Sequence, residues 1–145
     1  MVRLVEITAD SLSSILKLKV ASNQEKFVAN NAISIAQAHF HPETAWFRGI
    51  YDDETPVGFV MLSLEIPKNE FWIWRLMVAE GFQGKGYGKA AVQAVKDFVH
   101  QTYHPPVLYV SIVPEEGSPQ GFYEKLGFED TGRMEEGEVI LEYKY

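Results

Sequence analysis

The segment 83–88 carries three glycines at alternating positions, with Lys85 inside it and Lys89 directly after it. An apolar run that ends at Val78 precedes the segment, and apolar residues at helical spacing begin at Tyr87. Glycine allows tight turns and leaves backbone N–H groups uncovered by a Cβ atom. A helix N-terminus adds unpaired N–H donors and the positive end of the helix dipole. The segment therefore predicts a diphosphate-binding loop between a strand and a helix.

Two common nucleotide-binding motifs do not fit this segment. A P-loop requires Lys and then Ser or Thr after its second glycine, whereas Tyr87 follows Gly86 here. A dinucleotide-binding fingerprint requires a third glycine where this chain has Lys89. The pattern that remains is Gln-x-x-Gly-x-Gly, from Gln83 to Gly88.

A second motif, Gly-Phe-Tyr-Glu-Lys-Leu-Gly-Phe, occupies residues 121–128, after an expected helix and strand. Together the two motifs resemble the coenzyme A loop and the tyrosine-bearing helix of the GNAT superfamily of N-acetyltransferases. The resemblance spans essentially the whole chain and implies that Tyr123 is catalytic. When an amine attacks acetyl-CoA, the leaving thiolate needs a proton. A phenol of pKa about 10 can supply one to a thiol of pKa about 8.5.

The same resemblance implies acetyl-CoA as the cosubstrate, with a backbone N–H near Met77 or Val78 that polarises the thioester carbonyl. Many family members have an asparagine seven residues before the tyrosine, where this chain has Glu116. Ser118 is the candidate to contact the cofactor instead. The full set of expected cofactor-binding residues is Leu76, Met77, Val78, Gln83, Gly84, Lys85, Gly86, Tyr87, Gly88, Lys89, Ser118 and Lys125.

Several stretches are similar to the bacterial diamine and spermine/spermidine acetyltransferases, among them Asn23–Glu25, Pro56–Met61 and Trp74–Val78. This similarity implies that a primary amine of a small polycation attacks acetyl-CoA directly in a ternary complex. Glu25 is a candidate to hold an ammonium group by a charge-assisted hydrogen bond. Trp74 is a candidate to line a slot for a methylene chain and to attract the cation. No residue is assigned as the general base.

Plainer interpretations stay open for these residues. Glu25 is equally suited to be a solvated charge at a helix end, and tryptophans such as Trp74 are often core residues. Another small amine, an antibiotic or a protein N-terminus are alternative acceptors within the same family. A non-catalytic acyl-CoA-binding module is the alternative from a different class.

The elements that must position these residues follow from the periodicity of apolar side chains. The run 107–113 is continuously apolar, which predicts a strand buried on both faces. The segment 22–31 is polar and weakly periodic, which is typical of a helix end followed by a loop. Strands are expected over 2–7, 46–51, 56–66, 71–78, 107–113 and 139–143, and helices over 12–20, 34–40, 87–103 and 118–126.

Helices that interrupt a mainly antiparallel series of strands predict one α+β domain over residues 1–145. The family resemblance implies an α/β/α-layered GNAT fold, in which a mixed sheet is splayed between two parallel strands. The cofactor would enter that gap like an extra strand. The C-terminal strand could complete this sheet or pair across a homodimer.

The net charge of −7 makes nucleic acids and anionic membranes poor partners, and a small polycation a better one. The absence of cysteine excludes disulfides, a thiolate metal site and a cysteine nucleophile. The four histidines show no metal-ligand spacing, so no metal is expected. Since no stretch reads as a signal peptide or a membrane span, we expect a cytoplasmic protein.

Overall fold

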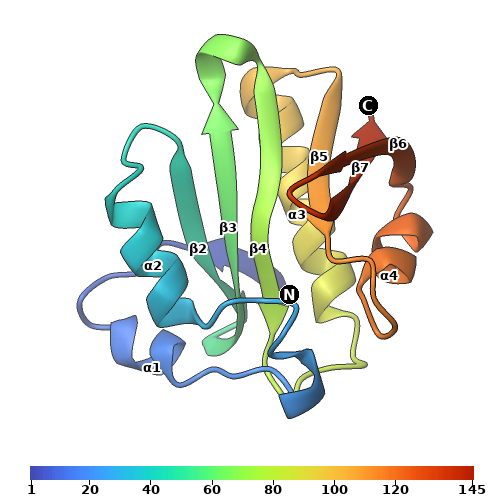
Figure 1. Ribbon diagram of the computed structural model, residues 1–145. Helices are drawn as coiled ribbons and strands as arrows, with labels where there is room; N and C mark the ends of the chain where they lie inside the picture. The colour runs from blue at the N-terminus through green and yellow to red at the C-terminus, as the bar shows by residue number, and fades with distance from the viewer.

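Seven strands form one mixed sheet in the order β1-β2-β3-β4-β5-β7-β6 (Figure 1). Every neighbouring pair is antiparallel except β4 and β5, which run parallel. The computed structural model describes residues 1–145, and its strands are β1 (Val2–Val5), β2 (Ala45–Asp52), β3 (Thr55–Glu65), β4 (Glu70–Val78), β5 (Val107–Ile112), β6 (Glu129–Glu135) and β7 (Glu138–Lys144).

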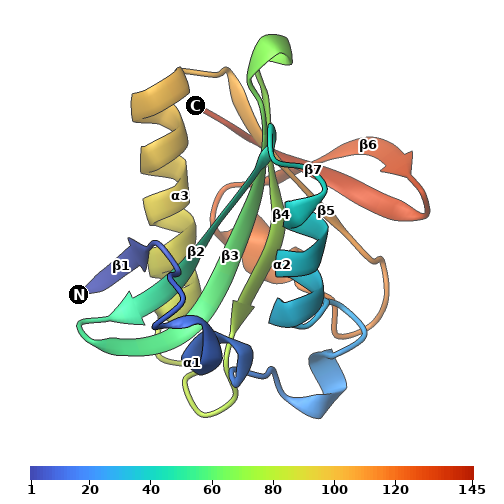
Figure 2. The ribbon, with the colours of Figure 1, turned by 90° about the vertical axis from the view of Figure 1, so that its left-hand side faces the viewer.

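Helices lie on both faces of the sheet, with α3 on one side and α1 and α2 on the other (Figure 2). The larger core includes Val92 and Val95 of α3, and the smaller one includes Ile15 of α1 and Ala38 of α2. This layering confirms the predicted α+β fold. The helices are α1 (Leu12–Leu16), α2 (Asn31–His39), α3 (Tyr87–Tyr103) and α4 (Gln120–Lys125), with 3₁₀ turns η1 (Ser22–Gln24) and η2 (Ile66–Lys68).

The sheet is splayed between its two parallel strands. β4 and β5 pair only at Trp72 with Tyr109 and at Ile73 with Val110, and beyond these pairs their C-terminal ends diverge (Figure 1). The residues of β4 after Ile73 therefore have a sheet neighbour only on the β3 side. This is the gap that the family resemblance implies.

A β-bulge in β4 lies where the splay begins. Ile73 pairs with Leu62 and Arg75 pairs with Met61, so Trp74 is the extra residue on β4. A bulge bends its strand and changes the direction of its side chains. Trp74 is thereby placed at the start of the gap between β4 and β5.

The prediction of a first helix through Val20 is wrong, because α1 ends at Leu16. The chain then runs past the end of β4, where the Lys19 carbonyl accepts a 2.7 Å hydrogen bond from the Glu80 N–H. The next helix, α2, begins three residues before the expected start at position 34. Asn30 explains the early start, because its side chain caps the helix by accepting a 2.8 Å hydrogen bond from the N–H of Ile33.

The prediction that 107–113 is buried on both faces is also wrong. Leu108, Val110 and Ile112 are buried in the core shared with α3, whereas Tyr109 and Ser111 on the opposite face are only half-buried. The apolar run therefore belongs to a strand that is fully buried on only one face.

β7 lies between β5 and β6 and pairs with both strands. Both of its edges are therefore used within the chain, so the C-terminal strand completes its own sheet. The sequence left open whether one or two strands follow the last helix, and the structure has two, of which β6 forms one edge of the sheet.

Candidate functional site

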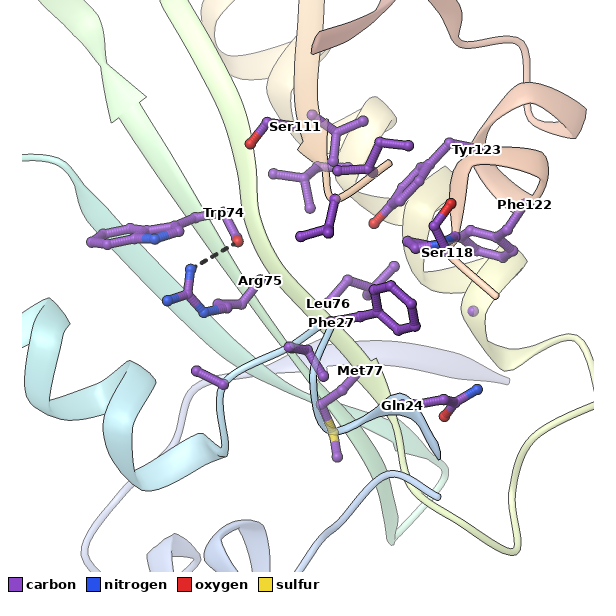
Figure 3. A pocket seen from close by; sticks show the side chains of 18 of the residues that line it. Gln24, Phe27, Trp74, Arg75, Leu76, Met77, Ser111, Ser118, Phe122 and Tyr123 are labelled. Atoms are coloured by element: carbon purple, nitrogen blue, oxygen red, sulfur yellow. Dashed lines mark hydrogen bonds between the residues drawn. The ribbon is translucent and has the colours of Figure 1, made fainter. Parts of the chain in front are cut away.

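A cleft of about 1560 Å³ opens where β4 and β5 diverge. Its lining comes from the end of β4, the glycine loop, the first turn of α3, the end of β5, the start of α4 and the segment 24–29 (Figure 3). Elements far apart in the sequence thus meet at one cavity, and most of the expected site residues lie in its wall.

The glycine loop has a conformation that other residues adopt rarely. Gly81, Gly84 and Gly86 have φ angles of 93°, 75° and 86°. A Cβ atom built on any of these three would meet nothing within 4 Å, so the backbone there borders open space. Positive φ explains the need for glycine, and the open space leaves room for a ligand to approach the backbone.

Gly86 is the N-cap of α3, and the first amide to bond within the helix is the Ala90 N–H, which donates to the Gly86 carbonyl at 3.0 Å. The N–H groups of Tyr87, Gly88 and Lys89 therefore have no intrahelical acceptor. A seventeen-residue helix adds a positive dipole end at this point. This is the donor set that a diphosphate requires.

The side chains of the loop have other partners. Gln83 Nε2 donates to the Val78 carbonyl at 2.9 Å and to Gln24 Oε1 at 2.6 Å. The Tyr87 hydroxyl donates to Asp52 Oδ2 at 2.6 Å, which lowers the pKa of Asp52 and raises that of Tyr87. The Tyr87 hydroxyl thus bonds to the end of β2, and the backbone N–H of Tyr87 is the group available to a ligand.

Alternate backbone N–H groups of β4 face the cleft. The Ala79 N–H donates to the Val57 carbonyl of β3 at 2.8 Å. Because hydrogen-bonding direction alternates along an antiparallel strand, the amides of Leu76 and Val78 face away from β3, and that of Met77 faces β3. Of the two amides expected to polarise a carbonyl, the one at Val78 therefore faces the cleft.

Tyr123 lies on α4 with its hydroxyl pointing into the cleft (Figure 3). The residue is 5% exposed, and its ring packs edge-on against Phe122 and Phe128. Its hydroxyl makes no hydrogen bond to another residue. Burial raises the pKa of Tyr123, so the phenol keeps its proton at neutral pH.

Ser118 also lines the cleft, whereas Glu116, at the position where many relatives have asparagine, does not. The Ser118 hydroxyl accepts a 3.4 Å hydrogen bond from the N–H of Gln120 at the start of α4. Two expected cofactor residues lie outside the lining. Lys85 has its Nζ 5.9 Å from the centre of the Phe82 ring, and Lys125 lies in the last turn of α4.

The β4 bulge forms another part of the wall. Trp74 lines the cleft, and its ring meets His41 edge-on at 5.6 Å. Arg75 also lines the cleft and contacts α2. Its Nη2 donates to Gln37 Oε1 at 2.9 Å, and burial lowers the pKa of the guanidinium.

Acidic side chains supply much of the charge in the lining. Glu25 is among them, but most belong to the tips of the β3–β4 and β6–β7 hairpins. A turn signal was available for the second hairpin, because Glu136-Gly137 is a two-residue loop with positive φ at both positions. The acidic lining residues are Glu25, Glu65, Glu70, Glu135, Glu136 and Glu138.

No group of three or more His, Cys, Asp or Glu side chains is arranged to hold a metal ion. None of the helices has the length and the apolar composition needed to cross a bilayer.

The chain matches the Acetyltransferase (GNAT) family over residues 10–128. It is 28% identical over 145 residues to the spermine/spermidine N(1)-acetyltransferase of Bacillus subtilis (strain 168), covering 93% of each protein. It is also 30% identical over 96 residues to the peptidyl-lysine N-acetyltransferase YjaB of Salmonella typhimurium, covering 66% of this chain and 58% of that one.

Among solved structures, the PaiA N-acetyltransferase from Thermoplasma acidophilum in complex with coenzyme A superimposes with a TM-score of 0.75. The superposition covers 100% of this chain and 99% of that one at 15% sequence identity. The two proteins therefore share the whole fold.

Proposed function

Because the chain belongs to the GNAT acetyltransferase family, we propose that it acetylates a primary amine of a polyamine such as spermine or spermidine. The chain is an acetyl-CoA-dependent N-acetyltransferase, and the proposal concerns its acceptor. The observation that carries it is the acidic lining of the cleft. Glu25, Glu136 and Glu138 form no ion pair within 4.0 Å, and only Glu138 acts at longer range on a lining cation, Arg75, so these carboxylates can interact with a bound polycation.

The glycine loop and the first turn of α3 bind the diphosphate of the cosubstrate through the unpaired N–H groups described above. Acetyl-CoA supplies an acetyl group activated as a thioester. The Val78 N–H donates to the carbonyl oxygen of this group, where negative charge develops during attack.

Tyr123 completes the reaction by donating its phenolic proton to the departing sulfur. A C–N bond forms as the C–S bond breaks, and the amine releases its proton to solvent while the phenol is reprotonated. Since burial raises the pKa of Tyr123, the protonated form that this step needs is the one present at neutral pH.

The acceptor is tested by following thiol release from acetyl-CoA with a panel of amines at matched ionic strength. The panel contains spermine, spermidine, an alkyl monoamine, an aminoglycoside, an amino acid and a lysine-containing peptide. We expect kcat/KM for spermine to exceed that for the monoamine by about 10-fold or more, since each ion pair adds binding free energy. A best activity with the peptide, the aminoglycoside or the amino acid would contradict the polyamine proposal.

Calorimetric measurement of acetyl-CoA binding distinguishes the proposed enzyme from a non-catalytic acyl-CoA-binding module. Acetyl-CoA binding without thiol release for any amine would identify a module that binds the cofactor and does not turn it over. We expect instead that binding and turnover are both measurable in the same preparation.

A further inference from the structure

Lys96 of α3 is the only charged side chain among the buried residues, at 6% exposure. Its ammonium group donates a short hydrogen bond to the Leu126 carbonyl. It also lies 3.9 Å from the centre of the Tyr143 ring and 5.5 Å from that of Phe128. A buried ammonium group is unfavourable unless it has partners. Here these partners are one carbonyl and two aromatic faces, and no carboxylate.

The carbonyl that Lys96 binds belongs to the C-cap residue of α4. α4 ends in a Schellman motif, in which the Phe128 N–H donates to the Tyr123 carbonyl and the Gly127 N–H to the Glu124 carbonyl, both at 3.1 Å. The motif leaves the Leu126 carbonyl without a backbone donor. Lys96 provides that donor from a different helix, together with the positive charge that a helix C-terminus favours.

A second contact joins the same two helices at Phe122, in the middle of α4. A Cβ atom on Gly88 would lie 3.2 Å from the Phe122 ring, so the first turn of α3 and the middle of α4 are in close contact. Tyr123 follows Phe122 directly, and its ring also packs against Phe128, beside the Lys96 ammonium group. Two fixed points, one on each side of Tyr123, set the orientation of α4 relative to α3.

We propose that Lys96 is a positioning residue for Tyr123. By binding the Leu126 carbonyl, Lys96 fixes the Tyr123 hydroxyl relative to the α3 N-terminus. α3 provides the N–H donors for the diphosphate, and α4 provides the proton donor. The relative position of the two helices therefore sets the distance between the diphosphate site and the Tyr123 hydroxyl. This inference rests on the proposed role of Tyr123. Displacement by about 1 Å is enough to slow a reaction that depends on alignment.

The test is a double-mutant cycle of Lys96→Met and Tyr123→Phe, with thiol release measured at saturating acetyl-CoA and the best acceptor. We expect Lys96→Met to lower kcat by about 10-fold or more in the wild-type background and by less than about 2-fold in the Tyr123→Phe background. The KM for acetyl-CoA should stay within about 3-fold, because the α3 N-terminus is intact. Lys17→Met removes an exposed lysine outside the cleft and should leave kcat unchanged.

Equal losses of kcat in the two backgrounds would overturn the proposal, because they would show that Lys96 acts independently of Tyr123. If Tyr123→Phe alone retains full kcat, the proposed role of Tyr123 itself fails, which is a different result. Lys96→Arg keeps the charge and the donor and should retain more kcat than Lys96→Met. If neither Lys96 variant folds, Tyr143→Leu removes one aromatic face, and the same background-dependent loss is expected from it.

Discussion

Gln83 and Gln24 are 59 positions apart, yet Gln83 Nε2 donates a 2.6 Å hydrogen bond to Gln24 Oε1. The same nitrogen also donates a 2.9 Å hydrogen bond to the Val78 carbonyl. One side chain therefore connects the glycine loop, the cleft-facing backbone of β4 and the segment 24–29. A change at Gln24 should reach the cofactor loop through this connection.

Gln24→Ala should raise the KM for acetyl-CoA by about 2- to 12-fold, the range expected from the loss of one hydrogen bond. Thermal stability should change little, because this hydrogen bond is exposed. Gln93→Ala is the matched control, since Gln93 makes a 3.0 Å hydrogen bond to Asp97 on the exposed face of α3. If the connection carries the effect, Gln24→Ala should add nothing to Gln83→Ala. Additive effects in the double variant would refute this interpretation.

In the half of the cleft where the cofactor is expected, the local backbone conformation could be predicted from the sequence because its requirements are local. Gly84 and Gly86 need positive φ, which few other residues adopt, and they immediately precede a helix. The helix that bears Tyr123 ends in a Schellman motif that Gly127 makes possible. Such motifs lie within a few residues and are visible in one sequence.

The half that faces the acceptor depends on contacts between distant segments. Glu65 and Glu138 belong to separate hairpins, and only the sheet order brings both hairpins to one cleft. Trp74 occupies a bulge that exists only because of the register between β4 and β3. The segment that follows the early end of α1 likewise contacts the end of β4, through the hydrogen bond between the Lys19 carbonyl and the Glu80 N–H. The spacing of apolar residues along the chain does not reveal any of these contacts.

Gly86→Asp should weaken acetyl-CoA binding far more than Gly86→Asn. Both side chains tolerate the left-handed backbone at Gly86 for a similar strain of about 1 kcal/mol. Only aspartate places a negative charge beside the expected diphosphate. Calorimetric Kd values for acetyl-CoA should differ by about 10-fold or more between the two variants at low salt. Equal Kd values for the two variants would show that the diphosphate does not bind at this loop.

Gly88→Ala should destabilise the contact between α3 and α4, because its Cβ would lie 3.2 Å from the Phe122 ring and 3.7 Å from Val78 Cγ2. Overpacking of this kind costs about 1–3 kcal/mol, and the better helix propensity of alanine offsets about 1 kcal/mol. Adding Phe122→Leu should restore stability, since the smaller side chain makes room for the methyl group. Denaturant unfolding of both single variants and the double variant measures this coupling. A double variant no more stable than Gly88→Ala would contradict the packing argument.

Tyr123→Phe should make the protein less sensitive to alkaline pH. Burial raises the pKa of Tyr123 above the value of about 10 that tyrosine has in an unfolded chain. The stability contributed by the neutral phenol is therefore fully present below about pH 10 and is lost as pH rises towards the folded-state pKa. The variant keeps no ionisable group at this position and should lose less stability over that interval.

Thermal unfolding at about pH 7.5 and about pH 10.5 measures this difference. At the lower pH the two proteins should have similar Tm, because the Tyr123 hydroxyl makes no hydrogen bond to another residue. At the higher pH the wild type should show the larger decrease. Parallel decreases would mean that the phenol ionises as readily in the folded protein as in the unfolded chain.

Glu138→Gln should raise the KM for spermine and leave the KM for an alkyl monoamine nearly unchanged. Glu138 lines the cleft on the β6–β7 hairpin, forms no ion pair within 4.0 Å and acts only at longer range on Arg75, so its charge can interact with an ammonium group distant from the reacting one. A partly exposed ion pair contributes about 0.2–1 kcal/mol, which corresponds to a change of up to about 5-fold. Glu54→Gln is the matched control, because Glu54 is exposed and lies outside the cleft lining. The difference between the two variants should shrink as salt screens the charge. An equal rise in KM for the monoamine would show that Glu138 does not recognise the second charge, and the acidic lining would no longer support a polyamine acceptor.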